Sequence, residues 1–435
     1  MQKTVKAAEA ISRGLIIQTT QVLGTVLSFE HPADAVLSRH FRENRDLGHR
    51  DRGFIAETVY GIVRRLRWLR RIAGATATPR QLLLAWLARG EGWPMRQFEG
   101  LASATERDWI ESIKSATLDE GTVAERADLP DWLTERLLAS HDEAAVLQLA
   151  YSLNRPAPLD LRVNVLKADR DAVLAKLNED GFAAEACTMS PQGIRLAGKP
   201  ALQKYPLFLE GGFEVQDEGS QLLGLLVQPK RSELVVDFCA GAGGKTLQLG
   251  AMMRSTGRLY AFDVSEKRLA KLKPRMARSG LSNVHPVLIA HENDAKVKRL
   301  AGKADRVLVD APCSGLGTLR RNPDLKWRQT PESVDEMVLK QGSILAAAAR
   351  LVRPGGRLVY ATCSLLAEEN DAVVDAFLAA NPAFKAVSAE EVLERQGVTL
   401  ATGERLRLSP HEHNTDGFFA AVLERQSSVP VAADA

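Results

Sequence analysis

The stretch LVVDFCAGAGGKTLQLG, residues 234–250, joins a short apolar run to a glycine-rich turn and then to the start of a helix. An apolar run of this length that ends in turn residues predicts a buried strand. The turn would aim backbone N–H groups at an anionic part of a ligand, because the first N–H groups of a helix lack acceptors within the helix. The stretch therefore predicts a strand, a binding loop and a helix of an α/β fold.

Similar apolar runs recur through the second half of the chain, separated by segments of helical periodicity. The expected strands are ELVVDF (233–238), GRLYAFD (257–263), VHPVLIA (284–290), DRVLVDAP (305–312), GGRLVYAT (355–362) and DGFFAAVLER (416–425). Strands that alternate with helices form a mostly parallel sheet that is covered on both faces. We therefore predict an α/β domain with a doubly wound, mostly parallel sheet over residues 216–426.

The part of the chain before this domain shows a different pattern of apolar residues. In FIAETVYGIVRRLRWLRRIAG (54–74) apolar residues recur three and four positions apart, which predicts helix, and residues 1–145 show no strand-like alternation. This predicts an all-α domain over 1–145. The Pro- and Asn-rich opening of LNRPAPLDLRVNVLK (153–167) favours a linker with a small α+β subdomain over 146–215, and 427–435 is typical of a loose tail.

Basic residues gather at the beginning of the chain. Residues 1–75 hold 13 Lys and Arg against 7 Asp and Glu, and Arg64 and Arg65 lie beside Trp68 in the arginine-rich helix. A charge run in isolation most often forms a solvated helix face. Arginines near aromatic rings also suit RNA phosphates and bases, so an RNA contact is the second interpretation.

Composition excludes several classes of protein. No apolar run approaches the roughly 20 residues that span a bilayer, and the first residues lack the pattern of a signal peptide, so we expect a cytoplasmic protein without membrane segments. Four scattered cysteines fit neither disulfides nor zinc spacing, and His411 and His413 have no third ligand nearby. We expect no metal, and a monomer.

Three cofactors could use the glycine loop. A P-loop needs a glycine where Cys239 stands, although the acidic strand end RVLVDAP imitates an ATPase, so an ATPase acting on RNA stays the enzyme alternative. A dinucleotide loop needs a third glycine where Thr246 stands. S-adenosylmethionine carries a carboxylate and a ribose but no phosphate, and glycines, Lys245 and Asp263 would suffice for it. Asp294, after the third strand, could accept the adenine amino group.

Two cysteines end matching stretches, VLVDAPCSG (307–315) and LVYATCSL (358–365). In open α/β sheets ligands bind beyond the carboxyl ends of the strands, so Cys313 and Cys363 should face one crevice. Two thiols and a carboxylate are what methylation at carbon 5 of a cytosine needs. One thiolate adds to carbon 6, a carboxylic acid near ring nitrogen 3 supports the charge, and a second group assists release. These residues alone leave open which cysteine is the nucleophile.

The chain resembles the Sun family of RNA cytosine-5 methyltransferases. Within this family it looks like the RsmB type, which modifies 16S ribosomal RNA. DAPCSGLGTLRRNPDLKWR (310–328) and YATCSLLAEEN (360–370) carry the resemblance most specifically, and FIAETVYGIVRRLRWL (54–69) is similar to the family's NusB-like domain. The resemblance implies a Rossmann-like class I methyltransferase domain behind an all-α NusB-like domain. A non-catalytic RNA-binding protein is the alternative, against which the presence of both cysteines argues.

The resemblance also implies roles for individual residues. It makes Cys363 the nucleophile, Cys313 the residue that assists release, and Asp310 the contact to the base. It places S-adenosylmethionine on Cys239, Ala240, Gly241, Ala242, Gly243, Gly244, Lys245, Asp263, Asp294 and Asp310. The expected RNA contacts are Arg64, Arg65, Arg320, Arg321, Lys326 and Arg328. The family's loop reads CAAPGGKT, whereas Gly241-Ala242 replaces its Ala-Pro here, which costs the loop rigidity.

Overall fold

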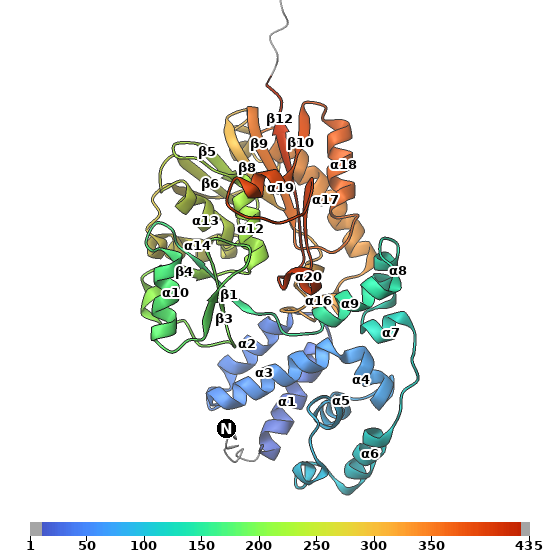
Figure 1. Cartoon of the computed structure of the whole chain (residues 1–435). Helices are drawn as coiled ribbons and strands as arrows, with labels where there is room; N and C mark the ends of the chain where they lie inside the picture. Colours follow the sequence, from blue (N-terminus) through green and yellow to red (C-terminus); the bar gives the residue numbers. More distant parts are fainter. Residues whose placement is uncertain (1–10, 428–435) are drawn as a thin grey trace, which may run out of the picture. The chain divides into compact units, whose positions relative to one another are not determined.

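The computed structural model describes residues 11–427 and divides the chain into two compact units (Figure 1). The first unit runs through Arg155 and takes in Leu319–Thr330, and the second holds Pro156–Thr318 and the chain from Pro331 onward. The first unit thus extends past residue 145, where the sequence predicted its end. Residues 1–10 of the predicted helical domain, and 428–435 of the predicted tail, lie outside the described residues.

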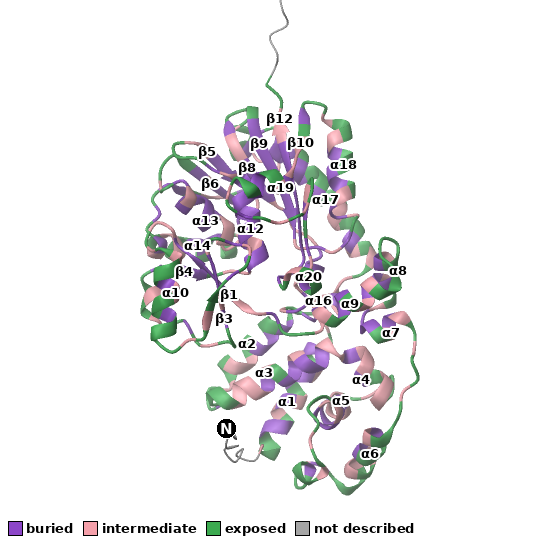
Figure 2. Ribbon diagram, viewed as in Figure 1, coloured by how far each residue is buried: buried purple, intermediate pink, exposed green. Residues whose placement is uncertain are grey.

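The first unit is helical, as predicted. Its helices are α1 (Arg13–Val26), α2 (Ala33–Glu43), α3 (His49–Arg64), α4 (Leu66–Ala73), α5 (Pro79–Ala85), α6 (Ala104–Ser115), α7 (Val123–Ala127), α8 (Asp131–Leu138), α9 (Glu143–Leu153) and α16 (Leu325–Arg328), with a π-helix at Trp86–Gly90 and a 3-10 turn at Met95–Phe98. Side chains such as Ser103 and Thr122 cap helices by accepting from the backbone N–H three residues on. The apolar stripes of α1, α3 and α4 form a buried core (Figure 2).

The segment Leu319–Thr330 comes from the sequence between two strands of the second unit but folds with the helices. Lys326 is 1% exposed, and its Nζ donates to Arg64 O at 2.8 Å, Asp128 O at 2.6 Å and Asn154 Oδ1 at 3.1 Å. Trp327 Nε1 donates to Val63 O at 2.9 Å. The helical unit is therefore completed by residues that follow Cys313 in the chain, which the predicted linear order of domains did not include.

A small antiparallel sheet opens the second unit, in the segment where the sequence predicted a small α+β subdomain. Its strands lie in the order β2-β3-β1-β4. They are β1 (Leu159–Val163), β2 (Ala184–Ala186), β3 (Gly193–Leu196) and β4 (Phe213–Val215), accompanied by α10 (Arg170–Glu179) and α11 (Pro206–Leu209). Leu161, Ile194 and Phe213 are fully buried and form its core with α10.

The large sheet has eight strands, in the order β10-β12-β9-β8-β5-β6-β7, with β11 paired to β12. The strands are β5 (Leu234–Asp237), β6 (Arg258–Asp263), β7 (Val284–Leu288), β8 (Ala304–Asp310), β9 (Val352–Thr362), β10 (Phe384–Val387), β11 (Arg405–Leu408) and β12 (Phe418–Arg425). Strands β5 to β9 run parallel to one another, whereas β12 pairs antiparallel with β9, β10 and β11. The predicted mostly parallel α/β fold is confirmed.

The helices that accompany this sheet bury apolar cores with it. They are α12 (Glu218–Val227), α13 (Gly244–Met252), α14 (Glu266–Ser279), α15 (Ala295–Lys298), α17 (Pro331–Ala349), α18 (Asp371–Ala380), α19 (Ala389–Glu394) and α20 (Pro410–His413). Strand β8 lies between β5 and β9, so the chain segments that leave these three strands meet at one edge. Among the helices of residues 11–427, none has both the length and the apolar character that crossing a membrane would take.

Candidate active site

A cavity of about 810 Å³ opens at the carboxyl ends of the parallel strands. Its walls come from the glycine loop after β5, from Asp263 at the end of β6, from the loop after β7, and from the segments that follow β8 and β9. Of the predicted site residues it is lined by Cys239, Ala240, Gly241, Ala242, Gly244, Lys245, Asp263, Asp310, Cys313 and Cys363. The sequence motifs thus converge on one cavity.

The glycine loop adopts a backbone that requires its glycines. Gly241 has φ 57° and Gly243 has φ 87°, both in the left-handed region that residues with a Cβ avoid. A Cβ on Gly243 would also meet Leu272 Cδ1 at 2.2 Å. Gly243 caps α13, whose first N–H groups have no acceptor inside the helix, and Gly241 N donates to Asp263 Oδ2 at 2.8 Å. The loop is shaped to receive a negatively charged group.

Two buried or half-buried arginines brace this loop from outside the cavity. Arg162, on β1, donates to Gly244 O at 2.7 Å, and Arg275, on α14, donates to Ala242 O at 2.5 Å. Arg275 is itself held by Glu214 on β4 at 2.9 Å. Although Ala242 replaces a proline, its carbonyl is therefore fixed by a guanidinium, which limits the loop's freedom.

Asp237, at the end of β5, is a cavity residue that sequence reasoning missed. It is 1% exposed, Thr246 Oγ1 donates to its Oδ2 at 2.6 Å, and its Oδ1 has no hydrogen-bond partner among the described residues. Burial raises its pKa to about 7. An unpartnered carboxylate oxygen beside a helix N-terminus fits an amino acid group, which carries both an ammonium and a carboxylate. The position, directly before the glycine loop, was the signal that could have identified it.

Lys245 and Asp310 form an ion pair in the cavity wall. Lys245 Nζ lies 2.7 Å from Asp310 Oδ2, and the side chains are 11% and 32% exposed. Burial lowers the pKa of Lys245, but the charge and hydrogen bond of Asp310 outweigh burial and raise the pKa above its ordinary value. The pair therefore keeps a proton available at the end of β8.

The two cysteines meet as the sequence predicted. Cys313 Sγ and Cys363 Sγ lie 3.4 Å apart, and both line the cavity. The hydrogen bond with Cys363 and burial raise the pKa of Cys313 well above that of a free thiol, and the charges of Cys363 and Glu369 add to the effect. Cys313 consequently retains its proton, and it can donate that proton to Cys363 Sγ.

Asp294, the residue predicted to contact adenine, caps the short helix α15. It is not among the residues that line the cavity. Its Oδ2 accepts from Ala290 N at 2.9 Å, and its Oδ1 accepts from Lys296 N at 2.8 Å at the start of α15. Asp294 thus shapes the loop whose residues Ala290 and His291 line the cavity, and its contact with an adenine amino group stays a prediction.

Two of the predicted RNA contacts, Lys326 and Arg320, require a correction. Lys326 and Arg320 are buried, with exposed fractions of 1% and 6%, so neither side chain is presented to a phosphate. Arg64 Nη2 donates to Arg320 O at 3.1 Å, and Arg65 pairs with the buried Asp128 at 2.8 Å. Arg328 lies 3.6 Å from Asp324, and Arg321 is half-buried. Lys326, Arg64, Arg65 and Arg328 are thus engaged within the helical unit, which carries the matching acceptors, whereas an RNA contact of Arg321 stays a prediction.

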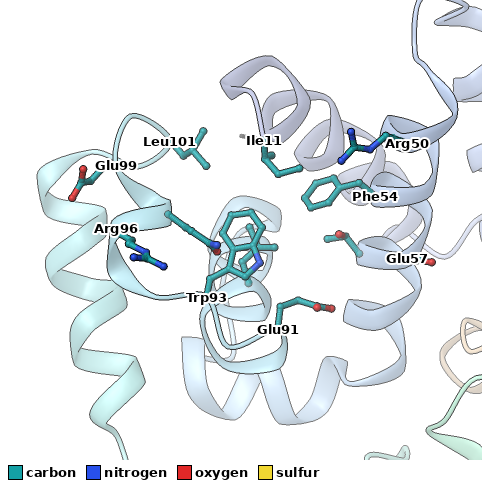
Figure 3. A pocket seen from close by; sticks show the side chains of 12 residues that line it. Ile11, Arg50, Phe54, Glu57, Glu91, Trp93, Arg96, Glu99 and Leu101 are labelled. Carbon is teal, nitrogen blue, oxygen red and sulfur yellow. The ribbon is translucent and has the colours of Figure 1, made fainter. Parts of the chain in front are cut away.

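A second cavity, of about 610 Å³, lies within the helical unit (Figure 3). Phe54 and Trp93 line it together with Arg50 and Arg96, and the carboxylates of Glu57, Glu91 and Glu99 are placed around them. Three carboxylates outnumber two guanidiniums, so the cavity does not favour a phosphate. We assign it no chemistry.

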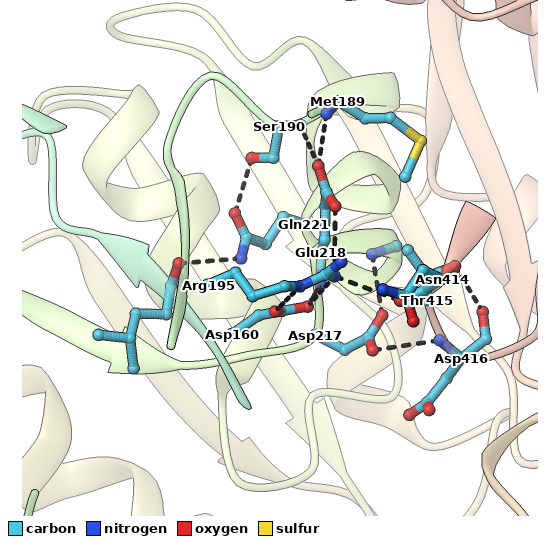
Figure 4. A network of polar contacts seen from close by, with 12 residues as sticks. Asp160, Met189, Ser190, Arg195, Asp217, Glu218, Gln221, Asn414, Thr415 and Asp416 are labelled. Carbon is cyan, nitrogen blue, oxygen red and sulfur yellow. Dashed lines mark hydrogen bonds and ion pairs between the residues drawn. The ribbon is translucent and has the colours of Figure 1, made fainter. Parts of the chain in front are cut away.

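The turn that follows His411 and His413 is tied to the small sheet by a polar network. No group of three or more potential metal ligands occurs among residues 11–427. Arg195 joins Asp160 at 2.7 Å and donates to Asn414 O at 3.2 Å, while Asp416 N donates to Asp217 Oδ2 at 3.1 Å (Figure 4). This network fixes the turn that precedes β12.

Comparison with known proteins places the chain among ribosomal RNA methyltransferases. A family model described as 16S rRNA methyltransferase RsmB/F matches residues 224–424, which include the glycine loop and both cysteines. A second model, the ferredoxin-like domain of RsmF/B-like methyltransferases, matches residues 129–203. The probable ribosomal RNA small subunit methyltransferase B of Synechocystis is 32% identical over 426 residues, or 90% of this chain and 94% of that protein.

Solved structures share the fold. The crystal structure of PH0851 aligns with a TM-score of 0.77 and 27% identity, and the match covers 96% of this chain and 100% of that one. NSun6 from Pyrococcus horikoshii, solved with SFG, aligns with a TM-score of 0.61 over 68% of this chain and 98% of that chain. At 22% identity this second likeness speaks for the fold alone.

Proposed function

Since the chain belongs to the 16S rRNA methyltransferase RsmB/F family, we propose that it methylates carbon 5 of a cytosine in small-subunit ribosomal RNA. The family resemblance seen in the sequence is confirmed, and the helical N-terminal region is consistent with a NusB-like domain. The observation that carries the proposal is the pair of thiols 3.4 Å apart, in a cavity that Asp310 also lines.

The cavity suits S-adenosylmethionine as methyl donor. The open N-terminus of α13 can bind the carboxylate of its methionine part, and the unpartnered Oδ1 of Asp237 can accept from its ammonium. Asp263 keeps acceptor capacity for ribose hydroxyls beyond the bonds from Gly241 N and Ser265 N, because a carboxylate accepts about four hydrogen bonds. The relative NSun6 was solved with SFG, an analogue of S-adenosylmethionine.

Cys363 is the nucleophile in this proposal. Its thiolate adds to carbon 6 of the cytosine, and the electron pair of the carbon 5–carbon 6 double bond moves into the ring. Asp310 contacts ring nitrogen 3, and the Lys245–Asp310 pair delivers a proton there that neutralises the charge. The cytosine is thereby activated at carbon 5, and bound S-adenosylmethionine supplies an electrophilic methyl group.

Cys313 serves the second half of the cycle. The proton on carbon 5 must leave, so that the electron pair of that bond restores the ring double bond and expels Cys363 as a thiolate. Cys313 lies beside Cys363, so it can give its own proton to the departing Cys363 sulfur and, as the strong base that its high pKa implies, take the proton from carbon 5. The same high pKa disfavours Cys313 as the resting nucleophile.

The helical unit binds RNA in this proposal, through side chains other than those that the structure uses internally. Arg70, in α4, is exposed, whereas Arg65 is paired. Arg321 remains a candidate contact. Exposed arginines meet phosphates without selecting a sequence, so this unit adds affinity and the cavity adds chemistry.

The test is a methyl transfer assay with unmethylated 16S ribosomal RNA and labelled S-adenosylmethionine, followed by mass spectrometry of the nucleosides. We expect 5-methylcytidine and no magnesium-dependent hydrolysis of ATP. Label in a ribose or in another base would contradict the cytosine assignment. ATP hydrolysis without methyl transfer would favour the ATPase alternative.

A further inference from the structure

Both active cysteines are followed by a serine, and both serines bind the same carboxylate. Ser314 Oγ donates to Glu369 Oε2 at 2.5 Å, and Ser364 Oγ donates to the same oxygen. The backbone N–H of Ser314 donates to Glu369 Oε1 at 2.8 Å. One side chain thus joins the segment after β8 to the segment after β9.

Glu369 is buried and does not line the cavity. It is 0% exposed, and Gln341 Nε2, from α17, donates to its Oε1 at 2.9 Å. The same Gln341 nitrogen donates to Pro312 O at 2.9 Å, directly before Cys313. Four donors therefore surround the carboxylate, which is the complement that an ionised carboxylate accepts.

The Cys363 segment is also held from its other side by backbone contacts. Gly317 N donates to Cys363 O at 2.9 Å, and Gly417 N donates to Gly317 O at 2.8 Å. A Cβ on Gly317 would lie 2.1 Å from Gly417 O, so only glycine permits this approach. The backbone of Cys363 is fixed on one side by glycines and on the other by the bond from Ser364 to Glu369.

We propose that Glu369 is a positioning residue that clamps the two Cys-Ser dipeptides and so sets the 3.4 Å separation of the thiols. The importance of this separation rests on the proposed function, in which the two thiols perform opposite halves of one cycle. Glu369 acts through the serines and touches no reacting atom. Its loss removes the carboxylate to which Ser314 and Ser364 both bond, so that the segments after β8 and β9 can move apart, while the bond of 3.2 Å between Ser314 Oγ and Ser364 Oγ can persist.

The first test compares turnover in Glu369→Ala and Glu369→Gln, with Glu391→Gln on the surface of α19 as matched control. We expect kcat of Glu369→Ala to fall on the order of 10²-fold, the cost of misplacing reacting groups by about an ångström. The KM for S-adenosylmethionine should stay within about twofold, because the clamp lies outside the cofactor loop. Glu369→Gln should recover most of the loss, since its amide can still bond both serines. Ser364→Ala, which removes one arm, is the milder variant if Glu369→Ala does not fold.

The second test measures the clamp without methyl transfer. Diamide oxidises two neighbouring thiols to a disulfide and is itself reduced to the hydrazine, at a rate that depends on how closely the thiols approach. We expect Cys313–Cys363 cross-linking, followed by mass spectrometry, to be slower in Glu369→Ala or Ser364→Ala than in the parent and in Glu391→Gln. Unchanged cross-linking and unchanged kcat in the folded variants would overturn the proposal. If the parent makes no 5-methylcytidine, the proposed function is wrong. The cross-linking rates would still test whether Glu369 sets the separation of the two thiols.

Discussion

Each of the two units buries a lysine, and the two lysines have opposite surroundings. Lys245 meets the carboxylate of Asp310 at 2.7 Å, which raises its pKa despite burial. Lys326 meets the neutral acceptors Arg64 O and Asn154 Oδ1 together with Asp128 O, and burial lowers its pKa to about 8. A buried lysine paired with a carboxylate in a cavity serves chemistry. A buried lysine surrounded by carbonyl groups, as Lys326 is, stabilises the interior of its unit.

The sharpest test of this comparison is Lys245→Met. We expect methyl transfer to fall on the order of 10²-fold or more, because a charged donor is removed from the place where the ring gains charge. Lys326→Met, which removes an ammonium from the other unit, is the matched control. The two lysines would not differ in role if, at a temperature where both variants are folded, both lost methyl transfer to the same degree.

The second prediction concerns stability. Lys326→Met should lower the free energy of unfolding by about 1–3 kcal/mol, because three buried acceptors lose their donor. Urea denaturation, followed through the helical signal, measures this free energy of unfolding. A variant as stable as the parent would mean that Lys326 contributes no net stability.

The stability difference should also depend on pH. The pKa of Lys326 is lowered from 10.5 to about 8, so between these values the unfolded chain binds more protons than the folded one. The free energy of unfolding of the parent, relative to Lys326→Met, should therefore rise between about pH 8 and about pH 10.5 and be constant below pH 8. A difference that falls over this range would contradict the low pKa.

The smallest expected effects distinguish two arginines of α4: Arg65, which caps its N-terminus, and Arg70, within the helix. Arg65→Ala should cost about 1 kcal/mol of stability, because it removes a partner of the buried Asp128. Arg70→Ala, at an exposed position, should leave stability unchanged but reduce the salt dependence of RNA binding by about 0.7 in slope, the value of one phosphate contact. Thermal denaturation and binding at several salt concentrations measure the two quantities. If instead Arg65→Ala reduced the salt dependence and Arg70→Ala lowered the stability, Arg65 would be the RNA contact.

The sequence predicted the strands of the large sheet and the meeting of the two cysteines because both depend on local pattern and on strand direction. It did not predict β10 and β11, whose four-residue runs FKAV and RLRL have little apolar signal. The burial of Lys326 was out of reach, because its acceptors come from positions as distant as Arg64. Asp294 showed the ambiguity of an acidic residue after a strand, which can bind a ligand or cap a helix.

Glu369 belongs to a motif that the sequence singled out, yet its role could not be predicted. The serines that it bonds are 50 residues apart, and only the neighbouring positions of β8 and β9 bring them together. Asp237 was overlooked for a different reason. A carboxylate at the end of a strand has an evident structural role as a partner of Thr246, and its unpartnered oxygen is visible only in three dimensions.

In the proposed reaction Cys363 attacks the base and Cys313 assists release. The direct measurement is a denaturing gel of Cys363→Ala and Cys313→Ala, each incubated with labelled RNA and S-adenosylmethionine, with Cys187→Ala, in the small sheet, as control. We expect Cys313→Ala to accumulate a slow, RNase-sensitive band, because the adduct forms but is not released, and Cys363→Ala to show none. A band in Cys363→Ala and none in Cys313→Ala would contradict the account.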